Sequence, residues 1–411
     1  MTDMEKKPIQ GRAILALACT VLMLFVPNYA QYQLSPLAHL IMPAYDLDAA
    51  QFSMLFSAAM VAGIVFSLIA GILCDRFGVK RVVGIVSLVS VGALIVRIFA
   101  PNFAILFICM VLAGLIATFV NANTAKIMGS WFPPEFVGVT VGIAMAGSTL
   151  AMVVGIGTSA LFPSVQAVFI FTAIVAVVAL IAWWVFFKDG PSGSLGATPD
   201  DEGGTPAAQP PLSECLKVAL KSRNVWIVGV ILGLNMASTM CILTFMPQVL
   251  QSMRGFDPTT AGALSSVITC GNLIGAIFVP IIGTRIGRFR PVAIVIAIVS
   301  AFCTAFAWQM PEGPAMLVCF FLTGFTLSGI MTTLISVVVL LPEIGPVYAG
   351  TAGGVAATLQ LFGAVVIPSY ILTPILGTNY PVLYAIAGAM CLVVAVCVFV
   401  LPEVFGHGPR E

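Results

Sequence analysis

Long apolar stretches recur along the whole chain, and short polar or charged interruptions separate them. A helix needs about 20 apolar residues to cross the roughly 30 Å of hydrocarbon in a bilayer. The stretches are continuous and do not alternate as β-barrel strands do. We therefore predict an all-α membrane protein with twelve transmembrane helices, at residues 13–34, 52–73, 82–100, 103–125, 137–161, 165–187, 223–250, 260–282, 291–309, 314–341, 347–373 and 380–401.

The composition agrees with this pattern and excludes a soluble enzyme. Hydrophobic residues make up 60% of the chain and charged residues 8%, whereas soluble domains carry about 25% charged residues. The net charge of +1 provides no basic surface for nucleic acid. The ten cysteines form no C-x-x-C pair, so we expect neither a disulfide framework nor a metal site, and no cofactor.

The positions of lysine and arginine predict the orientation. With the N-terminus in the cytoplasm, all of the 17 Lys and Arg residues except Arg97 and Arg254 fall on the cytoplasmic side. The first apolar run is too long for the core of a signal peptide, so we interpret it as a retained helix. We predict that both termini are cytoplasmic.

The chain divides into two similar halves. The only long polar stretch, 188–222, has the composition of a flexible linker, so we predict a six-helix bundle at 1–187, a cytoplasmic linker at 188–222 and a second six-helix bundle at 223–411. Duplicated six-helix halves are typical of transporters that bind substrate between the halves. A shift of 209 positions superimposes Arg76, Gly78, Arg81 and Pro133 on Arg285, Gly287, Arg290 and Pro342.

The segment Gly71-Ile-Leu-Cys-Asp-Arg-Phe-Gly-Val-Lys-Arg81 resembles the signature loop between helices 2 and 3 of the major facilitator superfamily, and 283–290 is a degenerate second copy. The resemblance implies a cytoplasmic gate that closes when an acid pairs across the two halves. The alternative is that the basic residues only enforce topology. Thr284 stands where the second acid would be, so the second copy departs from the pattern of a symmetric gate pair. The implied gating residues are Asp75, Arg76, Arg81, Arg285, Arg288 and Arg290.

A second segment resembles a narrower branch of the superfamily. Lys126 is followed by Trp131-Phe-Pro133, similar to a Lys-x4-Trp-Phe-Pro pattern of oxalate/formate, nitrate/nitrite, cyanate and hexuronate-type carriers. The alternative is structural, because Trp131 and Phe132 are suited to the membrane interface and Pro133 to a helix start.

Charged residues are almost absent from the predicted spans. No carboxylate lies at mid-depth, and we expect Arg97, near the outer end of helix 3, to snorkel to the headgroups. His39 lies in the first extracellular loop. This pattern disfavours proton coupling through a buried acid and favours facilitated transport or exchange. An anion would have to be held by neutral donors.

Neutral polar residues do occur at useful depth. The resemblance implies that helices 1, 4, 7 and 10 line the cavity, and the alternative for each residue is an interhelical hydrogen bond worth about 0.6 kcal/mol. The predicted substrate-binding residues are Asn28, Tyr29, Tyr32, Asn121, Asn123, Asn235, Thr239, Asn272, Thr326 and Gln360. Two small-x-x-x-small patterns, 271–275 and 350–354, predict close helix packing.

These observations favour a secondary or facilitative carrier for a small organic solute, most simply a carboxylate-type anion, working by alternating access as a monomer in the cell membrane. The alternative is an exporter of neutral or amphiphilic compounds, which the 28 Phe and 18 Met residues motivate. A nitrate/nitrite carrier and a transport-inactive sensor are weaker hypotheses. No span pairs a nucleophile with a base, so an enzyme is not expected.

Overall fold

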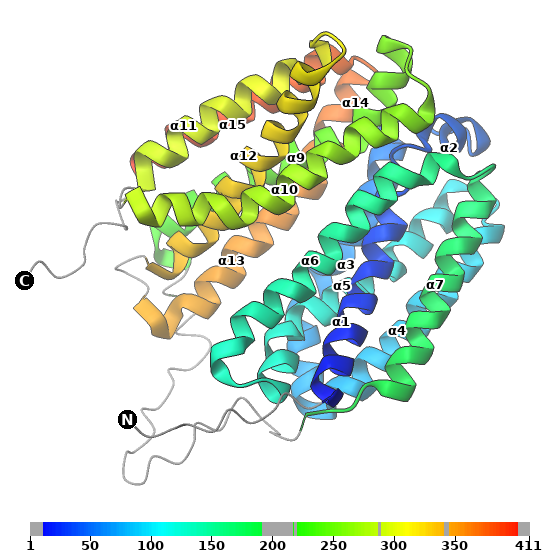
Figure 1. Cartoon of the computed structure of the whole chain (residues 1–411), viewed down its shortest axis with the longest axis vertical. Helices are drawn as coiled ribbons and strands as arrows, with labels where there is room; N and C mark the ends of the chain where they lie inside the picture. The colour runs from blue at the N-terminus through cyan, green and yellow to red at the C-terminus, as the bar shows by residue number, and fades with distance from the viewer. Residues whose placement is uncertain (1–10, 191–216, 218–219, 287–288, 341–344, 402–411) are drawn as a thin grey trace, which may run out of the picture.

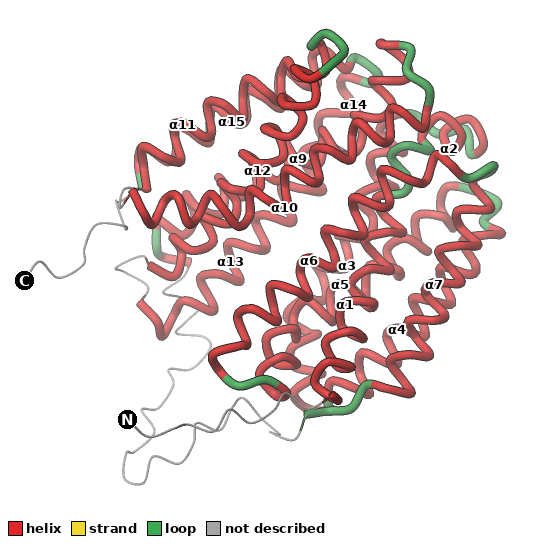
Figure 2. Tube along the Cα trace, in the orientation of Figure 1, coloured by secondary structure: helices red, strands yellow, loops and turns green. Residues whose placement is uncertain are grey.

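The computed structural model describes residues 11–190, 217, 220–286, 289–340 and 345–401. Figure 2 shows this part of the chain as helices joined by short loops, with no strand among the described residues. In chain order the elements are α1 (Gly11–Tyr32), α2 (Ala38–Ala44), α3 (Ala49–Phe77), α4 (Val79–Val96), η1 (Arg97–Phe99), α5 (Phe103–Trp131), α6 (Pro134–Thr158), η2 (Ser159–Leu161), α7 (Val165–Phe186), α9 (Arg223–Arg254), α10 (Pro258–Ile286), α11 (Phe289–Phe306), η3 (Ala307–Gln309), α12 (Pro314–Leu340), α13 (Gly345–Val366), η4 (Ile367–Leu372), α14 (Thr373–Leu376) and α15 (Tyr380–Val400).

Twelve of these helices are long and apolar enough to cross a membrane, which confirms the predicted number of spans. Each predicted range overlaps one of them. The short helix α2, between the first two spans, was not predicted. Most of the predicted linker, residues 191–216, lies outside the described residues.

The helices begin where polar side chains cap them. Asp48 starts α3 with a capping box, since its Oδ1 accepts from the Gln51 amide at 2.7 Å and Gln51 Oε1 accepts from the Asp48 amide at 3.1 Å. Asn102, Ser164 and Ser222 cap α5, α7 and α9 in the same way, each accepting from the backbone amide three residues on. These caps set where the four helices begin.

Figure 1 shows α1 to α7 as one bundle and α9 to α15 as another beside it. In the first bundle α3 packs on α5 and α1 on α6, and in the second α10 packs on α12 and α9 on α13. The two bundles meet where α6 contacts α10 and α3 contacts α13.

The repeat predicted from the loop motifs extends to the helices. Adding 209 to the bounds of α3, 49–77, gives 258–286, which are the bounds of α10. A close helix contact is repeated as well: a Cβ at Gly114 of α5 would collide with the carbonyl of Ala59, and one at Gly324 of α12 with that of Ile268, the counterpart of Ala59. The two halves therefore use the same packing.

Hydrogen bonds join the halves at one end of the bundle. Ser53 Oγ and Ser57 Oγ of α3 each lie 2.9 Å from Ser369 Oγ of η4, and Ser35 Oγ donates to the Thr244 carbonyl at 2.8 Å. We call Ser53, Ser57 and Ser369 the serine seal. Because α3 runs from the seal towards its basic C-terminus, we call the two ends of the bundle the sealed end and the basic end.

Candidate functional site

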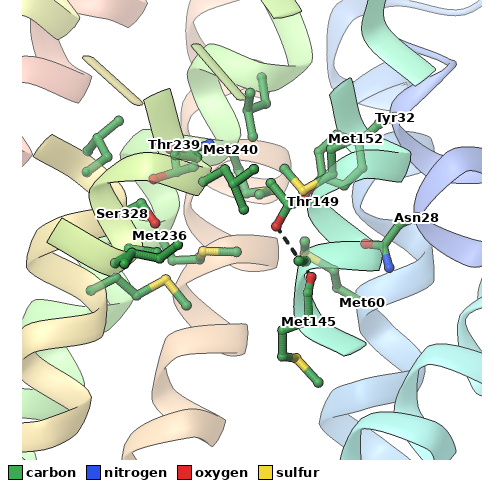
Figure 3. A pocket seen from close by; sticks show the side chains of 18 of the residues that line it. Asn28, Tyr32, Met60, Met145, Thr149, Met152, Met236, Thr239, Met240 and Ser328 are labelled. Atoms are coloured by element: carbon green, nitrogen blue, oxygen red, sulfur yellow. Dashed lines mark hydrogen bonds between the residues drawn. The ribbon is translucent and has the colours of Figure 1, made fainter. Parts of the chain in front are cut away.

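A cavity of about 540 Å³ lies between the two bundles, and helices of both bundles line it. In Figure 3 the labelled side chains from the N-terminal half, among them Asn28 and Thr149, face those from the C-terminal half, Met236, Thr239 and Ser328. We call this space the central cavity. Its volume falls within the usual range for small-molecule sites. Its position between the two halves is typical of substrate sites in transporters built from repeats.

The walls of the central cavity are largely apolar. Methionine is prominent, and its flexible, polarisable side chain fits apolar ligands of varied shape. None of the described residues that line the cavity carries a charge. The methionines are Met60, Met145, Met152, Met236, Met240 and Met331, and the polar residues are Asn28, Tyr32, Thr149, Thr239, Asn272 and Ser328.

Four of the predicted substrate-binding residues line this cavity: Asn28, Tyr32, Thr239 and Asn272. Asn28 Nδ2 donates to the Leu24 carbonyl at 2.8 Å, which leaves its oxygen as an acceptor. Asn272 Oδ1 is buried and has no hydrogen-bond partner among the described residues. An unpaired buried acceptor costs about 1–3 kcal/mol, so a ligand donor would be favoured there.

Two more predicted residues line other cavities. Asn121 lies in a smaller space beside the central cavity, described further below. Tyr29 lies on the other side of α1, in a pocket with Thr158 and Phe171, and its hydroxyl has no partner among the described residues.

The remaining four are buried. Asn235 and Gln360 make interhelical hydrogen bonds, as the structural alternative expects, whereas Asn123 and Thr326 donate to carbonyls of their own helices. Asn235 Oδ1 is buried without a partner among the described residues. Their side-chain donors and acceptors are Asn123 Nδ2 to the Phe119 carbonyl (2.9 Å), Asn235 Nδ2 to the Leu327 carbonyl (3.0 Å), Thr326 Oγ1 to the Leu322 carbonyl (2.7 Å) and Gln360 Nε2 to Met331 Sδ (3.4 Å).

The predicted gate lies at the basic end. Arg76, Arg81 and Arg285 are exposed there, and the Arg290 guanidinium donates to the Leu401 carbonyl within its own half. The Asp75 side chain and all of Arg288 lie outside the described residues. The gate assignment therefore stays a prediction. The predicted loop is also shorter than expected, because Gly78 alone, with a φ of 84°, connects α3 to α4.

The prediction that Arg97 snorkels is wrong. The side chain is fully buried (0% exposed), its Nη1 donates to the Ala30 carbonyl at 3.3 Å, and its guanidinium carbon lies 4.1 Å from the centre of the Phe169 ring. Nε and Nη2 are buried without a partner among the described residues. The turn η1 directs the side chain inward between α1 and α7.

Replacing Arg97 by methionine is expected to stabilise the protein. An unpaired buried charge is costly, and apolar replacements of buried ion pairs are often neutral or stabilising by about 1–4 kcal/mol. We expect Arg97→Met to raise the unfolding temperature in detergent by a few degrees. Arg254→Met is the control, since Arg254 donates to carbonyls at the surface, including Met310 at 3.0 Å, and should gain nothing. A lower unfolding temperature for Arg97→Met would contradict this account.

The methionines line the central cavity but were not among the predicted substrate-binding residues. Met236 and Met240 are four residues apart on α9, next to the predicted Asn235 and Thr239. Residues at this spacing lie on one face of a helix, so the pattern could have indicated that both methionines line the same surface. Methionine at helical spacing is, however, equally common in cores. Only the position between the two bundles distinguishes methionines that line a cavity from methionines that are buried in a core.

Comparison with known proteins agrees with the fold. A sequence model of the Major Facilitator Superfamily matches residues 11–368. A hexuronate transporter of Bacillus subtilis is 26% identical over 206 residues, 48% of this chain and about half (49%) of that protein. An MFS-type transporter of Mycobacterium tuberculosis is 24% identical over 341 residues, 80% of this chain and 72% of that protein.

Solved structures show the same architecture. A bacterial homologue of the human lysosomal transporter Spinster, described as inward-facing and unoccupied, aligns with a TM-score of 0.75 and 13% identity over 95% of both chains. The nucleoside transporter NupG aligns with a TM-score of 0.73 and 12% identity, over 95% of this chain and 99% of that one. At these identities the likeness concerns the fold alone. With twelve spanning helices and a family match over most of its length, the chain is a multi-pass membrane protein that belongs to the Major Facilitator Superfamily of transporters.

Proposed function

We propose that this protein carries a small, uncharged and partly apolar organic solute across the cell membrane by alternating access, and that the solute binds in the central cavity. The observation that carries the proposal is the lining of that cavity, which combines six methionines with neutral hydrogen-bonding groups. Burying a charge without a partner is expensive, whereas apolar contact and a few hydrogen bonds are favourable for a neutral solute.

The serine seal supports alternating access. It holds α3 against η4 at the sealed end through hydroxyl groups, so opening that end breaks hydrogen bonds and separates no ion pair. Such bonds contribute about 1 kcal/mol each, which suits a contact that forms and breaks in every cycle. We infer that the structure represents the state closed at the sealed end, because the serine seal and the bond from Ser35 to the Thr244 carbonyl join the two halves there.

A carboxylate-type anion is the second candidate. The similarity to a hexuronate transporter and the Lys126 segment favour it. Neutral donors would then have to replace the cation that a carboxylate usually needs. For either class of solute, we also propose the domain boundaries at 187 and 223 and the gating role of the six residues predicted above.

Thermal unfolding against a ligand panel tests the substrate class. A ligand at 100 times its Kd adds about 2.7 kcal/mol to the native state. We expect stabilisation by uncharged aromatic amides, alcohols or nucleosides, and little effect of formate, oxalate or glucuronate. Stabilisation by the carboxylates alone would replace the first candidate by the second.

A matched pair of tryptophan variants shows whether a ligand binds in the central cavity. Thr239→Trp fills the cavity and should remove the stabilisation. Val396→Trp adds the same side chain where residue 396 is 67% exposed on the outside of the bundle, so it should leave the stabilisation unchanged. An equal ligand response in both variants would place the binding site elsewhere.

A further inference from the structure

A second cavity, of about 300 Å³, lies between α1, α3 and α5, with Leu361 of α13 on its wall. Asn28 and Met60 line both this cavity and the central cavity, so the two spaces adjoin. We call the smaller space the side chamber. Its lining differs from that of the central cavity, because amide and hydroxyl side chains predominate over methionine: Asn28, Gln31, Ser67, Thr118 and Asn121.

The hydrogen bonds within the protein leave particular groups available in the side chamber. Gln31 is 4% exposed, and its Nε2 is buried without a partner among the described residues. Asn121 is exposed to the chamber and offers a donor and an acceptor. Asn28 and Thr118 already donate to the carbonyls of Leu24 (2.8 Å) and Gly114 (3.0 Å), so they offer acceptors. The chamber therefore presents donors and acceptors together.

We propose that the side chamber binds the polar head of an amphiphilic solute, an uncharged group such as a carboxamide that both donates and accepts hydrogen bonds, while the apolar body of the solute occupies the central cavity. This inference rests on the proposed function and narrows its substrate class. The carboxamide oxygen would accept from Gln31 Nε2 and from the Asn121 side-chain amide, and its NH₂ would donate to Asn28 or Thr118.

Charged heads fit less well. None of the described residues that line the chamber is charged, so a carboxylate would lose its hydration without gaining a cation, and an ammonium group would gain no anion. The acceptors Asn28 and Thr118 would also repel a carboxylate. A carboxamide both donates and accepts, so its own N–H and carbonyl groups can be paired in the chamber, which is the condition for favourable burial of a polar group.

Gly63 keeps the chamber open. A Cβ at this position would lie 3.2 Å from Leu361 Cδ1 and 3.8 Å from Thr118 Oγ1, so a larger side chain would project into the chamber. Gly63→Leu should therefore fill the space while Gln31 and Asn121 remain. Gln31→Met and Asn121→Leu remove the amides and keep the approximate volume. The three variants test the same site by two independent routes.

The test uses four probes with one apolar body and different heads: phenylbutanamide, phenylbutanoate, phenylbutylammonium and butylbenzene. Binding to the purified full-length protein is measured by calorimetry, with the unfolding temperature and elution profile of each variant as folding controls. We expect wild type to bind phenylbutanamide most tightly. Loss of one hydrogen bond should weaken that binding roughly tenfold in Gln31→Met and in Asn121→Leu, with butylbenzene unchanged. Gly63→Leu should likewise weaken the binding of phenylbutanamide and leave the binding of butylbenzene unchanged.

Other results would overturn the inference in distinguishable ways. If the amide and butylbenzene bind equally and none of the three variants changes either, the head does not occupy the side chamber, although a central site sensitive to Thr239→Trp would still stand. If phenylbutanoate binds most tightly and the variants weaken it, the chamber takes an anion and the uncharged class is wrong. If no probe binds, the inference fails, and alternating access is then judged separately by the cross-linking experiment below.

Discussion

A disulfide between residues 53 and 369 is expected to lock the protein closed at the sealed end. Ser53 Oγ and Ser369 Oγ lie 2.9 Å apart on different halves, so cysteines at both positions are close enough to be oxidised to a cross-link. The readout is a third cysteine, Thr149→Cys, in the central cavity. A membrane-impermeant maleimide added on the side of the sealed end should label this cysteine in the reduced protein, and oxidation should lower the labelling at least tenfold. A reductant should restore it.

The controls separate closure from damage. Labelling of the same cysteine from the basic end should continue after oxidation, and neither single variant, Ser53→Cys or Ser369→Cys, should respond to the oxidant. The nine cysteines in the described part of the chain form no disulfide with one another, so each labelled site must be identified by peptide mass spectrometry. Labelling that persists after complete cross-linking would show that the sealed end is not the barrier, and alternating access through this contact would be wrong. Because no substrate is needed, this result does not depend on the solute.

The fold was predictable because the membrane imposes it. Every backbone group must be bonded within its own helix in hydrocarbon, so length and hydropathy alone predict where the twelve spans lie. The repeat was visible in two loop motifs and holds for whole helices, as the shared bounds of α3 and α10 show. What the sequence did not predict are the short helix α2 and the departure from α-helical geometry at the π-helical η4, which carries Ser369.

The candidate site was only half predictable, because helices that are apolar on all sides give no indication of which face meets the cavity. Asn121 and Asn123 are two residues apart on α5, and one is exposed to the side chamber while the other bonds to the Phe119 carbonyl. Asn235 and Thr239 differ similarly, since only Thr239 lines the central cavity. Rotation of a helix about its axis depends on its neighbours, and that information is tertiary.

The small-residue patterns also show that a sequence pattern does not reveal which helix face meets a neighbour. Gly271 and Gly275 pack against the backbone at Phe321 and Phe325, as predicted. Among the described residues outside its own helix turn, Gly354 has no atom within 4 Å of the position where its Cβ would lie, so that prediction is wrong for this residue. The spacing is the same in both patterns, and only the partner helix differs.

The contact between α10 and α12 should be the most sensitive point of the fold, and Gly324→Ala tests it. A Cβ at Gly324 would collide with the Ile268 carbonyl and lie 2.8 Å from the Asn272 amide nitrogen. These are backbone atoms that no rotamer change can move, so the two helices must separate. Overpacking costs about 1–3 kcal/mol, and occasionally more where backbone is involved. We expect the unfolding temperature to fall by several degrees.

Gly92→Ala is the matched control, because no atom of the described residues beyond its own helix turn lies within 4 Å of a Cβ at residue 92. Alanine is favoured over glycine in a helix by about 1 kcal/mol, so this variant should melt at or slightly above the wild-type temperature. Separation of α10 from α12 also moves Asn272, whose side chain lines the central cavity, so ligand binding should weaken in Gly324→Ala alone. Equal unfolding temperatures for the two variants would mean that α12 can shift without cost. The close approach of α10 and α12 would then not be what holds the cavity wall in place.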